Sequence, residues 1–539
     1  MNESGFSVRP CGTRSLRLFY LPLTIGLGLL PLLLLALAVP PASAGGSVTN
    51  CTDAGLTAAL AGGGLVTFSC PANPFTITVT SQKVITQPTL IDGGSLGQVI
   101  LSGGHLTRTF AVQAGASLSL ENLVIRDGSE NDHLGGGAIL FLGDSLALTN
   151  TLFISNTSPF RGGAILMDGA AATIADSTFM FNRGTSDSSE GGAIYVNFGR
   201  SLITNSAFHD NQAGHGGALY NFGPLTMVIA SLYANYATSD GGAIQNFGPA
   251  WLTSVSIHDN TAAGAGGNGY GGGLGLNSTD AIVIDHAQIF ANRVITGNPQ
   301  FAGGGLALFN GVLTLTNSSV YSNVVDAGPG GGIHASYGAA LTVVNSAIYA
   351  NQAAGEGGGI DVRTTAGFSP TSLSLVNSTV SSNSASKGGG LSTDPQTSPL
   401  ITNATFDANN AAAGKELSGS VAIINSIIAG GGNLNCTGSV NSGGWNIDDG
   451  NSCGLAGIAD FSNTDPMLGP LAANGGPSLT QALLPGSPAI DLGLGSACPP
   501  TDQRGALRSP DVDGAGGCDT GAYEFQAFVN WLYLPLVRR

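Results

Sequence analysis

The sequence has little charge, and most of the charge it has is negative. Asp, Glu, Lys and Arg make up 9% of the residues, against about a quarter in ordinary globular domains. Seventeen Lys and Arg stand against 33 Asp and Glu, for a formal net charge of −16, and no basic cluster interrupts this balance. The composition therefore argues against a polyanion such as nucleic acid as the natural partner.

Cysteine is scarce and is missing from the long middle of the chain. After the first 44 residues six cysteines remain, in three close couples near the two ends. The usual zinc signature of cysteines two residues apart with histidines nearby is absent, so we expect no metal and no other cofactor. We predict three disulfides instead, joining Cys51 to Cys70, Cys436 to Cys453 and Cys498 to Cys518.

Residues 1–44 are expected to be a signal peptide. Arginines precede an apolar run, and Ala42-Ser43-Ala44 has the small-x-small pattern at which a signal peptidase cuts. The alternative is an uncleaved membrane anchor, because the run is long enough to span a bilayer, although Gly and Pro interrupt it. We expect a protein that is secreted or held at the cell surface.

Glycine is abundant, with 83 residues, and it marks an internal repeat. A step of the form Gly-Gly-small-Ile/Leu recurs at intervals of roughly 30 residues, the range of solenoid repeats. The last residue of this step is Ile139, Ile165, Ile194, Leu219, Ile244, Leu274, Leu306, Ile333, Ile360 or Leu391. We expect the paired glycines to permit positive φ at a tight turn.

A second marker, an apolar residue followed three positions later by Asn, accompanies each step. Asn tolerates the left-handed region at a turn, and its amide can pair with the Asn of the next turn. We therefore predict a structural ladder. Its members are Asn156, Asn182, Asn211, Asn235, Asn260, Asn292, Asn323, Asn351, Asn383 and Asn409.

Short β-branched stretches such as 201–208 and 341–348 flank the markers and predict strands that pair in parallel between turns. The fold class is therefore all-β, a parallel β-helix. Ile244 is expected in a stacked apolar row inside it. Insertions gather after the ladder Asn, so 183–190, 261–270 and 293–302 should form edge loops, which often carry the binding face of a solenoid.

The ends of a solenoid need caps. Residues 53–61 are expected to form a short helix with Thr52 or Asp53 as its N-cap. The expected divisions are 1–44, signal peptide; 45–129, N-terminal cap and irregular coils; 130–435, β-helix repeats; 436–526, a disulfide-stapled C-terminal cap; and 527–539, an apolar tail ending in Arg-Arg.

The Gly-Gly-Ala-Ile and Phe-x-x-Asn elements over roughly 130–430 resemble the repeats of chlamydial polymorphic outer-membrane proteins. That resemblance implies a right-handed β-helix similar in fold to pectate lyases, a hand that agrees with the usual crossover rule. The stretches 465–471, 474–478, 484–491, 501–505 and 518–524 resemble the choice-of-anchor Q domain of bacterial surface proteins. No series of strands typical of an outer-membrane barrel follows them.

The tail 527–539 is too short to span a bilayer. Two interpretations stay open: a sorting or anchoring tag that attaches the protein to the envelope, and a final strand packed on the cap.

Several acidic motifs are candidate sites. Asp210 and Asp259 lie in two His-Asp-Asn triplets, with one coil between them, about 10 Å apart if the stacking is regular. Such a pair could serve an inverting glycosidase, but the neighbouring Asn are ladder residues and decoration of the turn is favoured.

Two short elements, 214–216 around His215 and 463–465 around Asp465, resemble polygalacturonase motifs in the wrong order. The stretch 511–517 resembles a calcium loop but lacks EF-hand ligands, because 515 and 522 are Ala. Another calcium geometry, built from Asp502, Asp511, Asp513 or Asp519, is the alternative to a Gly-rich turn. We assign no catalytic, cofactor or metal residue.

These observations favour a monomeric structural or adhesive rod that recognises an extracellular glycan or surface protein through its edge loops. The alternative is a polysaccharide lyase or glycoside hydrolase of the β-helix type. Acidic and basic residues that converge on one strand face would favour the enzyme, and a uniform face of Asn, Ser and Thr would favour the rod.

Overall fold

The structure is a computed structural model that describes residues 45–130, 132–264, 269–296, 300–397, 399–508 and 517–526. The expected signal peptide, the tail 527–539, and Asp511 and Asp513 of the calcium-like stretch lie outside the described residues. No helix among the described residues is long and apolar enough to cross a membrane.

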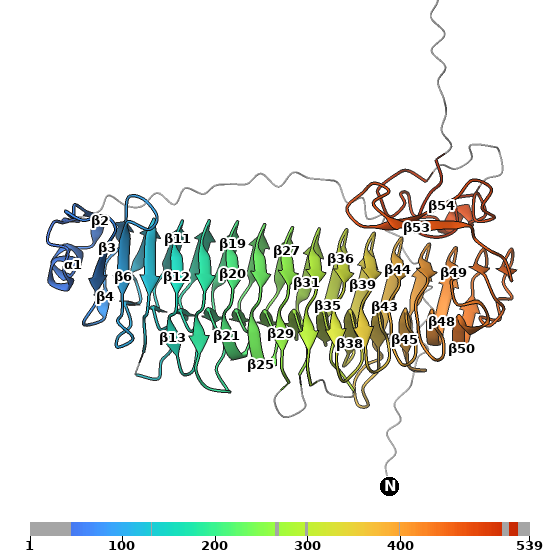
Figure 1. Ribbon diagram of the computed structural model, residues 1–539, viewed down its shortest axis with the longest axis horizontal. Coiled ribbons are helices and arrows are strands. Elements are labelled where there is room, and N and C mark those ends of the chain that lie inside the picture. The colour runs from blue at the N-terminus through green and yellow to red at the C-terminus, as the bar shows by residue number, and fades with distance from the viewer. Residues whose placement is uncertain are drawn as a thin grey trace, which may run out of the picture. The chain divides into compact units, whose positions relative to one another are not determined.

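The described chain is a parallel β-solenoid (Figure 1). One turn contains the strands β18 (Ile194–Val196), β19 (Arg200–Thr204), β20 (Ala207–His209) and β21 (Gln212–His215). Each pairs in parallel with its counterpart in the next turn: β22 (Leu219–Asn221), β23 (Leu225–Val228), β24 (Ser231–Tyr233) and β25 (Tyr236–Asp240). Repetition of this pattern gives parallel sheets of 28, 16 and 8 strands. The predicted all-β solenoid is confirmed.

Alternation along each strand separates the core from the surface. In β19, Ser201 and Ile203 are buried while Arg200 and Leu202 are exposed. Equivalent residues stack from turn to turn, as the rings of Phe153 and Phe179 do with centroids 4.7 Å apart. One continuous hydrophobic cluster therefore runs through the turns, and Ile244, 1% exposed, belongs to it as expected.

The two glycines of each repeat have different roles, which corrects the expectation that both permit positive φ. The first adopts a left-handed conformation, as Gly191 does with φ 72° and Gly216 with φ 62°. The second is needed for close stacking, because a Cβ on Gly192 would overlap the carbonyl oxygen of Gly217 in the next turn. A side chain at that position would push two turns apart.

The expected edge loops begin as strands, which is a second correction. Each starts with two residues that belong to the eight-stranded sheet. These strands are β17 (Arg183–Gly184), β29 (Thr261–Ala262) and β33 (Arg293–Val294). Among the described residues of 183–190, 261–270 and 293–302, no further strand of this sheet follows these first two residues.

The N-terminal helix α1 (Asp53–Leu60) lies where it was expected. The Thr52 side chain is the N-cap and accepts a hydrogen bond from the Gly55 amide at 3.3 Å. Leu56 of the helix is fully buried in the main hydrophobic cluster. The helix thus covers apolar interior beside the strand β2 (Gly64–Phe68).

The C-terminal segment packs against the side of the last turns. It contains an antiparallel hairpin of β53 (Leu468–Ala472) and β54 (Thr480–Leu483) (Figure 1). Asn377 Nδ2 donates to the Thr501 carbonyl at 2.6 Å, and Thr379 Oγ1 donates to Gln503 Oε1 at 2.6 Å. This segment therefore covers the outer face of β44 (Thr379–Ser381).

Candidate functional site

The predicted asparagines form one continuous hydrogen-bonded row. Asn182 is typical: its Nδ2 donates to Asn211 Oδ1 at 3.0 Å and to the Phe153 carbonyl of the previous turn at 3.0 Å. Every member is at most 2% exposed. The row runs through Asn156, Asn182, Asn211, Asn235, Asn260, Asn292, Asn323, Asn351, Asn383 and Asn409. Its amides are occupied with one another and have no capacity left for a ligand.

The left-handed residue at this corner precedes the ladder Asn, contrary to expectation. Asp210 has φ 54° and Asp259 has φ 55°.

The row of asparagines ends on a residue that the repeat did not indicate. Asn409 donates its backbone and side-chain N–H groups to the buried Glu416 carboxylate, the backbone bond at 3.0 Å. Burial raises the pKa of Glu416 well above its usual value.

The six cysteines are joined in the three predicted pairs, Cys51 with Cys70, Cys436 with Cys453 and Cys498 with Cys518. Three disulfides indicate folding in an oxidising environment.

The two His-Asp-Asn triplets contribute to a stack of rings on the outer face of the 16-stranded sheet. Tyr233 lies between their imidazoles, with centroids 4.7 Å from His209 and 5.2 Å from His258. Asp210 and Asp259 each bind Nδ1 of the neighbouring histidine at 2.7 Å. Each carboxylate is therefore directed to its own histidine and the two do not face a common point.

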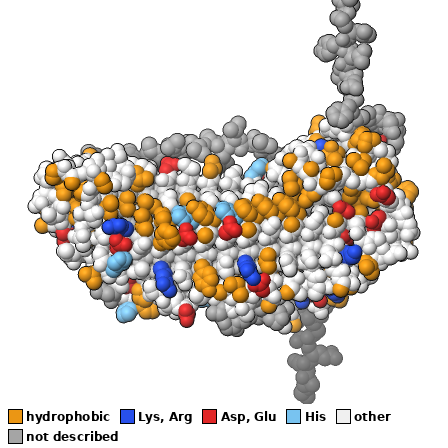
Figure 2. Space-filling model, in the orientation of Figure 1, with side chains coloured by type: hydrophobic (Ala, Val, Ile, Leu, Met, Phe, Trp, Pro, Cys, Tyr) orange, Lys and Arg blue, Asp and Glu red, His pale blue; other side chains and the backbone are white. Residues whose placement is uncertain are grey.

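This stack continues through residues that the sequence analysis did not single out. Phe290, Tyr321 and Tyr349 follow His258 with successive centroid distances of 4.6, 4.8 and 4.8 Å. Figure 2 shows a band of hydrophobic side chains, with His and acidic groups within it, along this face. Parallel stacked rings cover one another's faces and leave mainly edges to solvent, so the stack stabilises the turns rather than offering a platform.

The polygalacturonase-like elements do not meet. His215 Nδ1 forms a short contact with Asp240, and Asp465 accepts a hydrogen bond from the Met467 amide at 2.8 Å. Hydrogen bonding to Asp240 raises the pKa of His215. Both motifs have local structural partners.

Two arginines pair with acidic groups in the described part of the region named as an alternative calcium site. Arg504 Nη2 lies 2.7 Å from Asp502, and Arg508 Nη1 lies 2.9 Å from Glu524. Burial, followed by the nearby Glu524 charge, raises the pKa of Asp519 to about 7. Among the described residues, no group of three or more His, Cys, Asp or Glu side chains is placed to hold a metal.

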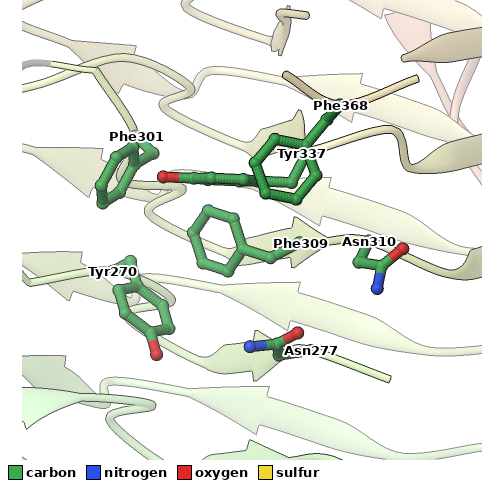
Figure 3. A pocket seen from close by; sticks show the side chains of 7 residues that line it. All are labelled: Tyr270, Asn277, Phe301, Phe309, Asn310, Tyr337 and Phe368. Carbon is green, nitrogen blue, oxygen red and sulfur yellow. The ribbon is translucent and has the colours of Figure 1, made fainter. Parts of the chain in front are cut away.

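An aromatic cavity lies on the outer face of β30 (Leu274–Leu276), β34 (Leu306–Phe309) and β38 (Ile333–Ser336) (Figure 3). Its volume is about 300 Å³. The strands supply Phe309 directly and place Asn277, Asn310 and Tyr337 immediately after their last residues. The lining consists of Tyr270, Asn277, Phe301, Phe309, Asn310, Tyr337 and Phe368.

Three insertions of the repeat contribute a ring each. Tyr270 ends the expected edge loop 261–270, and Phe301 lies in the loop 293–302. Phe368 comes from the long connection between β42 (Ile360–Val362) and β43 (Ser372–Val376). The cavity therefore lies where the sequence departs from the repeat. Phe309 and Tyr337 in particular could not be identified as cavity residues from the repeat pattern.

The rings of the cavity meet edge to face. Phe309 lies 4.6 Å from Tyr270 at an interplanar angle of 86°, and 5.6 Å from Phe301 at 82°. Tyr337 lies 4.8 Å from Phe368 at 87°. Perpendicular rings leave part of each face uncovered, in contrast to the rings of the outer stack.

Acidic and basic side chains converge on the strand face next to this cavity. Asp361 Oδ2 lies 2.9 Å from His334 Nδ1 and 2.8 Å from Arg363 Nε, and Arg363 Nη2 lies 3.3 Å from Glu356. His334 and Asp361 are fully buried. None of these four residues lines the cavity itself.

Comparisons with known proteins give the following. No family model matches the chain, and no curated protein matches it. Among solved structures the chain is similar to the A-module of the mannuronan C-5 epimerase AlgE6 of Azotobacter vinelandii. That similarity has 12% sequence identity, covers 78% of this chain and 96% of the other, and has a TM-score of 0.30. The resemblances to polymorphic outer-membrane proteins and to the choice-of-anchor Q domain stay predictions.

Proposed function

We propose that this protein is an exported β-solenoid that recognises a glycan at the aromatic cavity, in a structural or adhesive role at the cell surface. The observation that carries the proposal is that five rings and two amides line one cavity. Aromatic faces pack against the C–H groups of a sugar ring, and amides exchange hydrogen bonds with its hydroxyls. A small volume with a few fixed polar groups is typical of a ligand site.

The chemistry of the lining supports a neutral ligand. Asn277 and Asn310, with the hydroxyls of Tyr270 and Tyr337, are the polar groups of the lining, and no lining residue is charged. An acidic polysaccharide would lack a cation to pair with inside the cavity, and the formal net charge of −16 would oppose its approach.

The same lining supports binding over cleavage of a glycosidic bond. Hydrolysis of such a bond requires two carboxyl groups that flank it. The cavity contains none, and Asp361 is fully buried beside it. The export part of the proposal draws on the three disulfides and on the signal-peptide pattern of residues 1–44.

Screening the purified full-length secreted chain on a glycan array, followed by calorimetry with the glycans bound, tests this proposal. We expect Phe368→Ala and Phe301→Ala to weaken binding about tenfold or more, the equivalent of about 1.4 kcal/mol. Phe198→Ala is the matched control, because Phe198 is 65% exposed and lies outside the cavity. Absence of binding to any glycan, or equal losses in all three variants, would contradict the proposal.

A further inference from the structure

Four polar side chains beside the cavity have no part in the proposed glycan binding. His334 and Ser336 belong to β38, Asp361 belongs to β42, and Arg363 follows β42 directly. His334 pairs with Asp361 in the register of the two strands. On the other side, Ser336 pairs with Phe309, which lines the cavity.

Three of these groups form a carboxylate–imidazole–hydroxyl relay. His334 Nδ1 lies 2.9 Å from Asp361 Oδ2, and His334 Nε2 lies 3.0 Å from Ser336 Oγ. In the neutral tautomer that donates Nδ1–H to Asp361, Nε2 is left to accept from the Ser336 hydroxyl. This is the arrangement that activates a serine nucleophile: the base contacts the hydroxyl and a third group orients the base.

Arg363 completes the group. It follows Val362, which pairs with Ala335, the residue before Ser336. The two side chains therefore start about one strand spacing, roughly 4.8 Å, apart on the same face. The Arg363 side chain is 29% exposed, so it also reaches the surface. Its guanidinium contacts Asp361 and Glu356, and a cation this close to the relay can stabilise the negative oxygen that develops during acyl transfer.

We infer that Ser336, His334, Asp361 and Arg363 form an esterase site for a carboxylic ester with a small acyl group. Ser336 Oγ attacks the carbonyl carbon while its proton passes to His334 Nε2. The tetrahedral intermediate then expels the alcohol, which takes this proton, and leaves an acyl-serine ester. Water, deprotonated by His334, attacks that ester, and the acid leaves as Ser336 regains its proton.

Burial limits the acyl group. Ser336 is 2% exposed and lies between cavity residues, paired with Phe309 and followed by Tyr337. Because Ser336 does not itself line the cavity, we restrict the inferred substrate to an ester with a small acyl group such as acetyl, whose alcohol portion would extend toward the cavity. The identification of the alcohol as a sugar rests on the proposed function. The inferred ester hydrolysis is independent of it.

A purely structural network would have the same hydrogen bonds, so the test measures reactivity. The full chain is treated with a fluorophosphonate probe, labelled peptides are mapped by mass spectrometry, and hydrolysis of p-nitrophenyl acetate is followed in parallel. We expect covalent labelling at Ser336 in the native chain and loss of both labelling and hydrolysis in Ser336→Ala. His334→Ala should slow both about 100-fold or more.

Ser392→Ala is the matched control. Ser392 lies on the same strand face, is 1% exposed and donates to Glu356 at 3.0 Å, and its loss should leave labelling and hydrolysis unchanged. If the probe does not label Ser336 in the native chain, the inference is overturned, and this test does not depend on the folding of any variant. Full hydrolysis of p-nitrophenyl acetate by Ser336→Ala would also overturn it. Failure of glycan binding with intact labelling would instead contradict only the proposed function.

Discussion

Each ladder asparagine joins three successive turns through one side chain. Asn260 Oδ1 accepts from the backbone and side-chain N–H groups of Asn235 at 3.0 and 2.9 Å, and its Nδ2 donates to Asn292 at 2.9 Å. Asn260 is fully buried. Its neighbours therefore depend on it for hydrogen bonds that water cannot replace.

Asn260→Ala is expected to lower the free energy of unfolding by about 3 kcal/mol, because it leaves two buried N–H donors of Asn235 without an acceptor. Chemical denaturation measures the change. Asn197→Ala is the control, since Asn197 donates to Asp168 at an exposed position, and it should cost less than about 1 kcal/mol. Equal effects of the two substitutions would contradict a stabilising role for the buried ladder.

A core position allows a second test at the residue scale. Ile244→Asp places a carboxylate without a partner in the apolar row, which is expected to unfold the turns around it or to lower the melting temperature strongly. Trp251→Asp in the same turn is the control, because Trp251 points outward and is 44% exposed. Thermal melts that are alike for both variants would show that the register is wrong.

At the scale of elements, the sequence repeat predicts the strands that recur in every turn, but it does not predict the elements that differ from turn to turn. The strands at Ile194 and Phe208 could be located because inward apolar residues must recur where strands stack. The eight-stranded sheet escaped prediction, because strands of two residues such as β17 have no periodicity to detect. The disulfide pairs could be predicted because the cysteines are close in sequence.

The cavity illustrates what sequence periodicity omits. The loops 261–270 and 293–302 could be singled out because they interrupt the repeat, and each supplies one ring. That these rings meet Phe309 and Tyr337 depends on the stagger of neighbouring turns, which only the register reveals. The relay of Ser336, His334 and Asp361 was missed for the same reason: two of its members are on one strand and the third is on the next.

The C-terminal segment should respond to pH. Burial raises the pKa of Asp519 to about 7, so the folded segment keeps its proton in a range where the unfolded chain, with a pKa of about 4, has lost it. The stability of this segment should therefore fall as pH rises from about 4 to about 7 and then level off, as far as this group contributes.

Hydrogen-exchange mass spectrometry of peptides that cover 517–526, between pH 5 and pH 8, measures this dependence. The Asn side chain of Asp519→Asn does not ionise, so the stability of this segment should depend less on pH in that variant. If the stability of the segment changes with pH equally in both proteins, another group is responsible for the pH dependence.

At the scale of the whole molecule, the solenoid gives the site a rigid base. The cavity face is formed by consecutive strands that are hydrogen-bonded to turns on both sides. A ligand site on such a face is preorganised, and binding orders little beyond the side chains of the loops. The hand of the solenoid stays a prediction, right-handed according to the crossover rule of parallel folds.

The side-on attachment of the C-terminal segment also determines how the molecule bears load. A pull applied at residue 526 acts on several bonds at once, among them the one from the Phe525 amide to Asp519 and the one from Arg504 Nη2 to the Glu524 carbonyl at 2.6 Å. From there it passes to two neighbouring turns at once, through Asn377 to Thr501 and through the Ala522 amide to Thr405 Oγ1. Tension is thus shared across the stack instead of peeling away its terminal coil.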